Sequence, residues 1–487
     1  MYLPTIGLEI HSILKTRTKM FCSCPNDPRE RHPNVNVCPV CLGHPGVLPT
    51  MNQEAILSVI KLGLALGGTI AVNSHFDRKS YFYPDLPKGY QISQYEQTLV
   101  VGGVLKGVRI RRIHLEEDAG RLLHELPGES NKIDASYVDF NRAGVPLMEL
   151  VTEPDIKTAD EAVAFAKELQ LILRYLNVSR ADMEEGEMRV EANISIRAKE
   201  TEEWGTKVEL KNINSFKAVY EAIHYELRRQ EELLEEGKRV AQETRGWNEK
   251  TKKTESQRSK ESAHDYRYFP EPDLPELELS LFDLESIKRH LPELPEAKRS
   301  RFGKEFGLTV SQIELLVEDR EFSDYFEEAA SELETFDLEL TSLVLLYNYL
   351  TSDLKGIMRE RGVGFSELKI PPEHLTHLVA LIARGELSSR IAKDLLLRMF
   401  EQGDDPETLL KESGMKLMSN ESDLRGIVAT VLEANPQVVI DFKKGKQNSI
   451  QFLIGQVMAK TKGQASPNVA KKLLVDELEK LVDQNQK

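Results

Sequence analysis

The spacing of apolar residues changes near residue 290, and this change constrains the fold most strongly. Before it, apolar and polar residues alternate in short segments such as 5–14 and 188–197. Alternation with period two predicts strands with one apolar face. After it, apolar residues recur with helical spacing, and the proline-containing segment 291–295 favours an extended linker between the two parts. We therefore predict an α+β domain built on an antiparallel sheet, followed by all-α domains.

Capping and turn residues predict the element boundaries. Thr50 and Thr158 each stand three residues before Gln or Glu, the pattern of a capping box, and each predicts the start of a helix. A third helix is predicted over 215–236, ended by Gly237. A turn at 403–406 predicts a connector between two helical units. The predicted domains are residues 1–292, 293–405 and 406–487.

All four cysteines lie within twenty residues near the start of the chain, at Cys22, Cys24, Cys38 and Cys41. Two close thiol pairs can converge on zinc, because thiolates repel one another unless a cation joins them. We predict a structural zinc clip over residues 22–41, with disulfides or unrelated free thiols as the alternatives. If all four thiols are ligands, none remains to act as a catalytic nucleophile.

Length and charge limit the class of protein further. The 487 residues leave room for about three domains of ~150 residues. No stretch approaches the ~20 apolar residues that span a bilayer, and no secretory leader is recognisable, so we expect a cytoplasmic protein without a membrane partner. The formal net charge of −15 argues against a chain that wraps nucleic acid over its whole surface, although this average is compatible with a local basic surface.

Carboxylates and one histidine fall on predicted strands in three places. Glu9 and His11 share one face of the first strand, Glu116 and Glu117 come at the end of another, and Glu149 lies within an apolar run. Carboxylates with an imidazole suit Mg²⁺ or Mn²⁺, which bind nucleotide phosphates. A merely solvated polar face is the alternative. The scarcity of lysines around these residues favours the metal site.

Phosphate chemistry also needs cations, and the first domain offers several. The sequence contains neither a Gly-x-x-x-x-Gly-Lys-Ser/Thr phosphate loop nor a dinucleotide-binding glycine pattern. A nucleotide site would therefore use a metal, arginines and lysines on a sheet. The candidate ligands of phosphate or ATP are Arg78, Lys79, Lys88, Arg189, Asn193, Lys207 and Lys211.

Three other features favour structural over functional roles. The aromatic run 81–83 predicts a buried strand ended by Pro84, with base stacking as the alternative. The polar segment 242–265 predicts a mobile, solvated loop. His374 and His377 are expected to be exposed polar residues instead of metal ligands.

The C-terminal segment reverses the charge of the chain. Between Phe442 and Val475 there is no acidic residue. Clustered lysines attract phosphates independently of base sequence. A basic face that only aids solubility is the alternative. The candidate nucleic-acid ligands are Lys443, Lys444, Lys446, Lys460, Lys462, Lys471 and Lys472.

Taken in order, these motifs resemble the B-subunit family of the aspartyl/glutamyl-tRNA(Asn/Gln) amidotransferases, the GatB/GatE family. The resemblance covers essentially the whole chain, and so many ordered matches are far more specific than any single motif. The matching stretches are Ile6 to His11, Cys22 to Cys41, Phe76 to Asp85, Gln91 to Gln94, His114 to Gly120, Pro146 to Asp155, Met183 to Ser195, Glu209 to Phe216, Asp265 to Asp273, Gly455 to Met458 and Lys462 to Pro467.

The resemblance implies an ATP-dependent carbon–nitrogen ligase. The family phosphorylates the side-chain carboxylate of Glu or Asp esterified to the wrong tRNA, and ammonia then displaces phosphate to leave Gln-tRNA(Gln) or Asn-tRNA(Asn). The resemblance also implies a catalytic domain similar to glutamine synthetase and a YqeY-like tail that binds tRNA. The positions matching the family's Mg²⁺ site are Glu9, His11, Glu117 and Glu149, with Glu116 as an adjacent candidate.

The resemblance further implies partners, because the chain has no amidase signature and no spare cysteine with which to make ammonia. The implied assembly is a heterotrimer with the family's amidase (A) and small (C) subunits. The misacylated tRNA and the non-discriminating aminoacyl-tRNA synthetase that charges it are further partners. Two alternatives stay open. One is a free-standing glutamine synthetase-like ligase, which leaves the basic tail unexplained, and the other is a zinc-stabilised tRNA-binding scaffold without catalysis.

Overall fold

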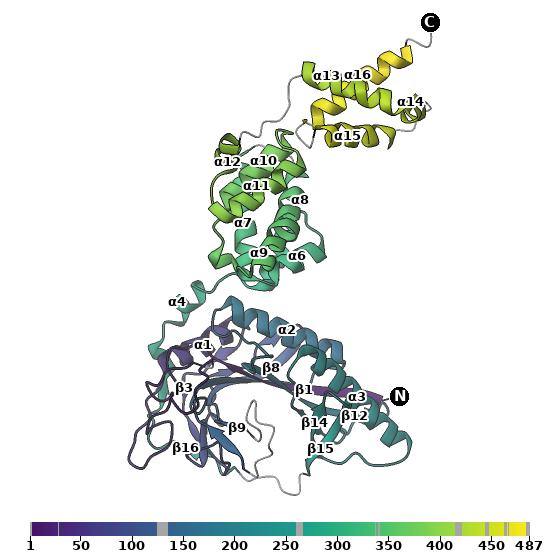
Figure 1. The fold of residues 1–487 in the computed structure, drawn as a ribbon. Coiled ribbons are helices and arrows are strands. Elements are labelled where there is room, and N and C mark those ends of the chain that lie inside the picture. Colours follow the sequence, from purple (N-terminus) through teal and green to yellow (C-terminus); the bar gives the residue numbers. More distant parts are fainter. Residues whose placement is uncertain are drawn as a thin grey trace. The chain divides into compact units, whose positions relative to one another are not determined.

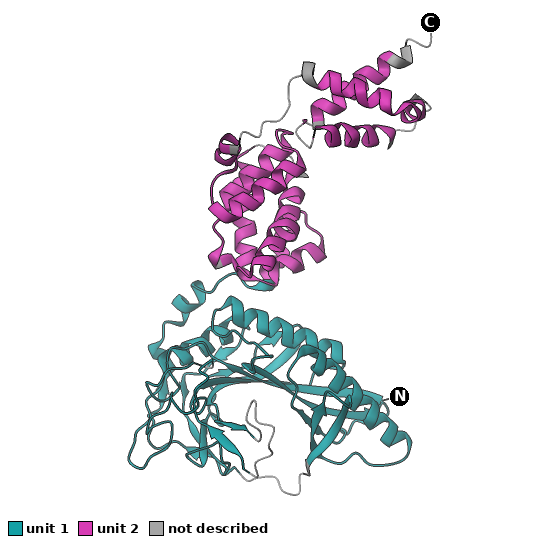
Figure 2. Cartoon of the chain, in the orientation of Figure 1, with its two compact units in different colours: residues 1–295 teal, residues 296–487 magenta. Residues whose placement is uncertain are grey.

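The computed structural model divides the chain into two compact units, residues 1–295 and 296–487 (Figure 2). The structure describes residues 2–27, 29–123, 135–259, 266–336, 338, 341–413, 421–443, 448–461, 465 and 467–483. The predicted combination of an α+β part with a C-terminal helical part is confirmed.

The first unit is built on one large sheet, in the order β15-β14-β13-β12-β1-β11-β8-β6-β2, with β7 paired to β8. Neighbouring strands are antiparallel except for the parallel pair β13 and β14. The strands are β1 (Tyr2–Ile13), β2 (Thr69–Ile70), β6 (Val100–Val101), β7 (Val104–Leu105), β8 (Val108–Glu117), β11 (Pro146–Thr152), β12 (Met188–Ala198), β13 (Val208–Lys211), β14 (Glu243–Asn248) and β15 (Lys253–Ser259).

Helices α1 (Gln53–Ala65), α2 (Ala159–Tyr175) and α3 (Phe216–Glu235) cover one face of this sheet (Figure 1). The apolar side of β1, formed by Ile6, Leu8 and Ile10, is buried in the core beneath them. The opposite face carries the polar residues of the same strands. This division follows from the alternation of side chains along a strand.

The helix caps differ in part from the prediction. Asn52 caps α1 in place of Thr50, because its side chain accepts hydrogen bonds from the amides of Glu54 and Ala55. Thr158 caps α2 as predicted, accepting from the Glu161 amide at 3.1 Å. The third predicted helix is confirmed as α3, with Ser215 as its cap.

Two segments of the first unit contradict the prediction. Part of the predicted loop 242–265 forms the hairpin of β14 and β15, while residues 260–265 lie outside the described residues. The hairpin has polar residues on both faces, and it is held by contacts such as Thr254 Oγ1 to buried Glu226 Oε2 at 3.0 Å. The aromatic run 81–83 is not a buried strand, because the preceding strand ends at Ser80 and Phe82 is 89% exposed.

Smaller sheets flank the large one. The strands β4, β5 and β16 form a three-stranded sheet, and the pairs β3 with β17 and β9 with β10 form two more. The remaining elements of this unit are β3 (Asn73–Ser74), β4 (Asp77–Ser80), β5 (Tyr90–Ser93), β9 (Arg121–Leu123), β10 (Tyr137–Asp139), β16 (Phe269–Pro270), β17 (Leu277–Glu278), η2 (Leu279–Leu281) and α4 (Leu284–Arg289).

The second unit is helical throughout its described part, and α13 to α16 enclose an apolar core of their own. His374 and His377 are half-buried here, with hydrogen bonds to the Gly403 carbonyl and to Asp405. No described helix has the length and apolarity needed to cross a membrane. The elements are α5 (Pro295–Glu305), α6 (Val310–Val317), α7 (Arg320–Glu334), α8 (Thr341–Asn348), the π-helical turn η3 (Tyr349–Leu354), α9 (Lys355–Arg361), η4 (Phe365–Glu367), α10 (Pro372–Ala383), α11 (Ser389–Gln402), α12 (Pro406–Ser413), α13 (Glu421–Ala434), α14 (Pro436–Lys443), α15 (Asn448–Lys460) and α16 (Pro467–Asp483).

Candidate functional site

Three neighbouring strands bring four of the predicted metal ligands together on the polar face of the large sheet. Glu9 and His11 come from β1, Glu149 from β11 and Glu116 from β8, and we call these four residues the acidic centre. His11 Nε2 lies 3.3 Å from Glu149 Oε2, 3.6 Å from Glu116 Oε1 and 3.7 Å from Glu9 Oε1. The register explains the meeting, because His11 of β1 pairs directly with Glu149 of β11.

A second histidine joins this group, although the sequence did not lead us to predict it as a site residue. His114 of β8 pairs in register with Glu149, and its Nε2 lies 3.4 Å from Glu149 Oε2. The signal was present in the sequence, because His114 stands two residues before Glu116 and therefore shares its strand face. Glu149 is thus held between two imidazoles.

Burial and mutual charge strongly shift the pKa values of residues in the acidic centre. Burial, followed by the charge of Glu149, raises the pKa of Glu9 to about 7. Burial opposes the charged form of His11, but the hydrogen bond and charge of Glu149 outweigh it and raise the pKa of His11 to about 9. Burial likewise opposes ionisation of Glu149, yet His114 and His11 hold its pKa well below its ordinary value. Without a cation, the proton on His11 offsets part of the negative charge of the carboxylates, and a bound cation would take the place of that proton.

The geometry fits a small divalent cation. Mg²⁺ binds oxygen at about 2.1 Å in an octahedron, which places adjacent ligand atoms about 3.0 Å apart. The distances of 3.3–3.7 Å around His11 Nε2 are only slightly longer. The donor set of carboxylates with imidazole is also appropriate for Mg²⁺ or Mn²⁺.

Glu117 lies apart from the acidic centre. Consecutive strand residues point to opposite faces, so the side chains of Glu116 and Glu117 lie on opposite faces of β8. Glu117 forms an ion pair with Lys88 and accepts a hydrogen bond from the Ile92 amide at 2.9 Å. Glu116 instead accepts a hydrogen bond from Ser93 Oγ at 3.2 Å. In this structure Glu116, not Glu117, completes the centre.

Lys79 is a predicted cation that interacts electrostatically with Glu116 and Glu149 of the acidic centre. Its ammonium lies 5.0 Å from the ring centre of Tyr266 and 6.0 Å from that of Tyr81. Burial opposes its charge, but Glu116 is the first of the groups that outweigh burial and raise the pKa of Lys79. A permanently charged lysine beside the carboxylates is suited to neutralising phosphate.

A second set of predicted cations follows β12 and β13. Lys211 Nζ lies 2.8 Å from Glu191 and 3.5 Å from Glu209, so Lys211 and Glu209 share one face of β13. Arg189 pairs with Asp118 at 3.1 Å. Asn193 has a buried Oδ1 without a hydrogen-bond partner among the described residues.

Two other predicted phosphate ligands, Lys207 and Arg78, form no hydrogen bond or ion pair with the acidic centre in the described part of the chain. Lys207 is exposed. The Arg78 guanidinium makes two hydrogen bonds to Glu271, at 2.7 and 2.8 Å, and a third to Asp273 at 3.2 Å. These contacts join β4 to the segment after β16.

The four cysteines converge as predicted. Their sulfur atoms all lie within 4.8 Å of one another, and no disulfide joins them. Cys38 and Cys41 Sγ are 3.9 Å apart, close to the ~3.8 Å edge of a tetrahedron with Zn–S bonds of about 2.3 Å. The Cys38 amide donates to Cys41 Sγ at 3.1 Å, and the Cys22 hydrogen bond lowers the pKa of Cys41 to about 5. The residues therefore fit a tetrathiolate zinc site.

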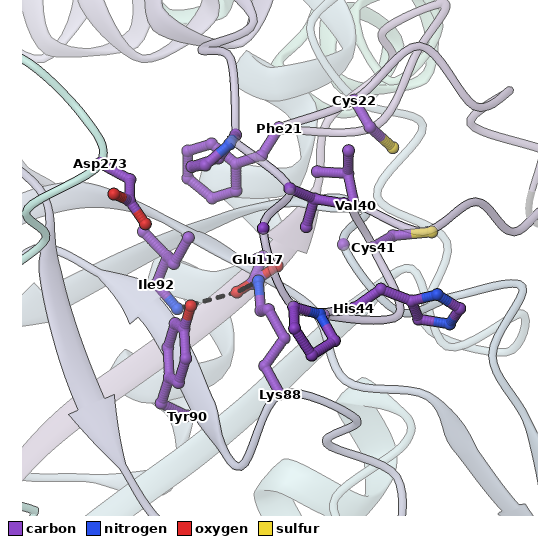
Figure 3. A pocket seen from close by; sticks show the side chains of 16 residues that line it. Phe21, Cys22, Val40, Cys41, His44, Lys88, Tyr90, Ile92, Glu117 and Asp273 are labelled. Carbon is purple, nitrogen blue, oxygen red and sulfur yellow. Dashed lines mark hydrogen bonds and ion pairs between the residues drawn. The ribbon is translucent and has the colours of Figure 1, made fainter.

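A cavity of about 210 Å³ lies beside the cysteines. In the view of Figure 3, Cys22 and Cys41 lie at one end of its lining and Asp273 at the other, with Glu117 and Lys88 between them. The cavity thus has the cysteine loop and the Lys88–Glu117 ion pair in its walls. The acidic centre does not line it.

Comparisons with known proteins agree with the motifs. The family model described as the GatB/GatE catalytic domain matches residues 4–283, which is more than half of the chain. The chain belongs to the GatB/GatE family. A second model, described as the GatB domain, matches residues 324–478.

Curated relatives of this GatB/GatE chain are named as the B subunit of aspartyl/glutamyl-tRNA(Asn/Gln) amidotransferase. The relative from Thermomicrobium roseum is 47% identical over 487 residues, covering 98% of this chain and 99% of its own. The relative from Carboxydothermus hydrogenoformans is 45% identical over 488 residues, covering 99% of both chains.

The GatB domain match includes the basic tail, where the structure tests few of the predicted lysines. Lys444, Lys446 and Lys462 lie outside the described residues. Lys443 ends α14, and its side chain is not described. The remaining three, on α15 and α16, are exposed, and these are Lys460, Lys471 and Lys472.

Proposed function

We propose that this chain is the B subunit of a glutamine- and ATP-dependent amidotransferase that converts Glu-tRNA(Gln), Asp-tRNA(Asn) or both to the amidated forms. The observation that carries the proposal is the acidic centre, in which three carboxylates surround His11 Nε2 at 3.3–3.7 Å. Full-length relatives named as this component of the enzyme support the same assignment.

The chemistry explains why such a centre is needed. A carboxylate resists attack by ammonia because its leaving group would be oxide. Its oxygen therefore attacks the γ-phosphorus of ATP, ADP leaves, and ammonia then attacks the acyl carbon, loses a proton and expels phosphate. Mg²⁺ bound at the carboxylates would supply electrostatic stabilisation of the phosphoryl group. The chain's own residues have matching tasks.

Each task rests on a described side chain. Glu9, His11, Glu116 and Glu149 would hold the cation. Lys79, whose charge is favoured by Glu116 and Glu149, neutralises charge on the phosphoryl group in transfer. Lys211 and Arg189 extend the cationic surface along the neighbouring strands, where their carboxylate partners hold them in place.

The finer architecture belongs to the same proposal. We assign a glutamine synthetase-like catalytic domain to residues 1–292, a helical domain to 293–405 and a YqeY-like tRNA-binding tail to 406–487. The separate apolar core of α13 to α16 supports an independent tail. The converging cysteines support a structural zinc ion that holds the loop 22–41 beside the catalytic sheet.

The proposed assembly is a heterotrimer with an amidase (A) subunit that makes ammonia and a small (C) subunit. The misacylated tRNA and its non-discriminating synthetase complete the set of proposed partners. We place the complex in the cytoplasm, where aminoacyl-tRNA is used. The relatives are named as one component of an amidotransferase, which supports an assembly of this kind.

The deciding experiment is transamidation by the reconstituted complex, with each mischarged tRNA offered separately and [γ-³²P]ATP as the phosphate donor. We expect ATP cleavage that depends on mischarged tRNA and yields amidated aminoacyl-tRNA. Turnover with free glutamate in the absence of tRNA would favour the free-standing ligase. Full activity after Glu9→Gln or His11→Ala, with tRNA binding retained, would favour the scaffold without catalysis.

A further inference from the structure

Lys19 is a buried cation that the proposed reaction does not use. It follows β1 in the chain, is 0% exposed, and is among the largest fully buried side chains of the described residues. Its ammonium donates to the Ala143 carbonyl at 2.7 Å and to the Phe140 carbonyl at 3.3 Å, and it lies 3.8 Å from Cys41 Sγ. No carboxylate appears among these contacts in the described part of the chain.

Such a position is unfavourable unless negative charge lies nearby. A buried ammonium loses its hydration free energy, and hydrogen bonds to two carbonyl groups offset only part of that loss. Lysines are therefore almost never fully buried unless they are paired. The remaining contact of Lys19 is the sulfur of Cys41, one of the four converging cysteines.

The tetrathiolate site has the opposite problem, an excess of negative charge. Four thiolates around one divalent ion carry a formal charge of −2. Three of the cysteines are half-buried, but Cys41 is only 4% exposed, so its share of this charge is removed from water. The backbone amide of Cys38 already donates to Cys41 Sγ at 3.1 Å, but an amide carries no net charge. A lysine at the same sulfur is the missing counter-charge.

We propose that Lys19 is the charge-compensating residue of the tetrathiolate metal site, where its ammonium stabilises the metal-bound thiolate of Cys41 and so strengthens binding of a thiophilic divalent ion. This inference rests on the zinc site of the proposed function. It adds a residue outside the four ligands. In the metal-bound protein the anionic site and the buried cation stabilise each other.

Lys19 also has a competing, purely structural interpretation. Through Phe140 and Ala143 it ties the cysteine loop to residues 140–144, and Gly144 there adopts φ +84°. A Cβ at Gly144 would lie 3.3 Å from the Cys41 Cβ and 3.7 Å from the Lys19 Cδ, so the packing is close. The test must therefore separate charge from packing.

The experiment compares Lys19→Met, Lys19→Gln and Lys19→Arg with wild type and with the control Lys15→Met. Lys15 is an exposed lysine four residues away, which donates to Asn177. Zinc affinity of the full chain is measured by competition with a chromophoric chelator, and Co²⁺ substitution reports the thiolate-to-metal absorption. Residues beside metal ligands typically change metal affinity by about 10–100-fold.

We expect Lys19→Met and Lys19→Gln to weaken zinc binding by about 10–100-fold, while Lys19→Arg and Lys15→Met stay within about threefold of wild type. The metal-free proteins give a second readout. Without metal, Lys19 pairs with at most the single thiolate of Cys41, so Lys19→Met should lower the unfolding temperature of the metal-free protein less than that of the zinc-bound protein.

The outcomes separate the two proposals. If wild type binds no zinc or Co²⁺, the zinc proposal itself is wrong, and the role of Lys19 fails with it. If wild type binds zinc and Lys19→Gln binds equally tightly, only the role of Lys19 is wrong. If Lys19→Met does not fold, the comparison of Lys19→Gln with Lys19→Arg decides, and equal weakening in both would overturn the charge argument.

Discussion

Glu149 and His114 face each other across β11 and β8, paired in register with 3.4 Å between Glu149 Oε2 and His114 Nε2. His11 approaches the same carboxylate oxygen from β1 at 3.3 Å. Two imidazoles therefore hold Glu149 ionised, with its pKa well below the ordinary value in spite of burial. A buried carboxylate kept charged before any cation arrives is preorganised for binding one.

This arrangement makes Glu149 the most informative residue to substitute. Glu149→Gln keeps the shape of the side chain but removes its charge, so it should lower tRNA-dependent transamidation by about 100-fold or more, the loss expected when several kcal/mol of metal-mediated stabilisation disappear. The Mg²⁺ concentration needed for half-maximal activity should rise as well. The matched control is Glu153→Gln, which alters an outward ion pair with Arg111 and should change activity by less than about twofold. Equal effects of the two substitutions would contradict the assigned role.

Arg78 should affect stability instead of nucleotide binding. Its guanidinium pairs with Glu271, whose side chain is 0% exposed. Arg78→Ala leaves this carboxylate buried without its partner, so we expect a loss of about 3–5 kcal/mol in the free energy of unfolding of the first unit. Denaturant titration measures this loss, and Arg78→Ala combined with Glu271→Gln should recover part of it. A large rise in KM for ATP with unchanged stability would restore the phosphate-binding role predicted from the sequence.

Removal of zinc should destabilise the cysteine loop. We expect one zinc ion per chain, and a thiophilic chelator in the presence of excess Mg²⁺ should lower the unfolding temperature of the protein, because metal binding contributes directly to folding. Cys41→Ser should reproduce the effect, whereas Ser23→Ala, between two of the ligands, should not. An unchanged unfolding temperature after complete metal removal would show that the loop needs no metal.

The tail should act on the tRNA substrate. Truncation after residue 405 is expected to raise KM for aminoacyl-tRNA far more than KM for ATP. Charge reversal at Lys460, Lys471 and Lys472 should weaken tRNA binding and reduce its salt dependence, because each lost phosphate contact lowers the slope of log affinity against log salt by about 0.7–0.9. Lys480→Glu is the matched control, since Lys480 is paired with Glu477 on the same helix. Equal changes in both KM values would indicate that the tail only stabilises the fold.

The sequence predicted an element correctly where its apolar residues followed a regular period. The alternation in 5–14 and 188–197 correctly identified β1 and β12, because one face of each strand is buried beneath helices. The hairpin of β14 and β15 was missed, because Trp247 is the one large apolar side chain of its strands, which are otherwise held by hydrogen bonds and ion pairs to residues such as Glu226. Tertiary contacts of this kind leave no periodic signal.

The candidate site shows the same limit. Strand alternation placed Glu9 and His11 on one face, but it could not say which of Glu116 and Glu117 would join them. That choice depends on the register between β8 and β11, which pairs His114 with Glu149 and turns Glu117 toward Lys88. The ion pair of Arg78 could not be foreseen for a similar reason, since its partner Glu271 is distant in sequence.

The two-sided construction of β1 lets this enzyme change in two independent ways. Ile6, Leu8 and Ile10 meet the helices, while Glu9 and His11 meet the opposite side. Volume-conserving substitutions in the apolar layer can therefore tune thermal tolerance without entering the ligand set, and substitutions on the polar side can be explored without repacking the core. For directed evolution, libraries built on the even-numbered and odd-numbered positions of one strand would address different properties, and their gains should combine nearly additively.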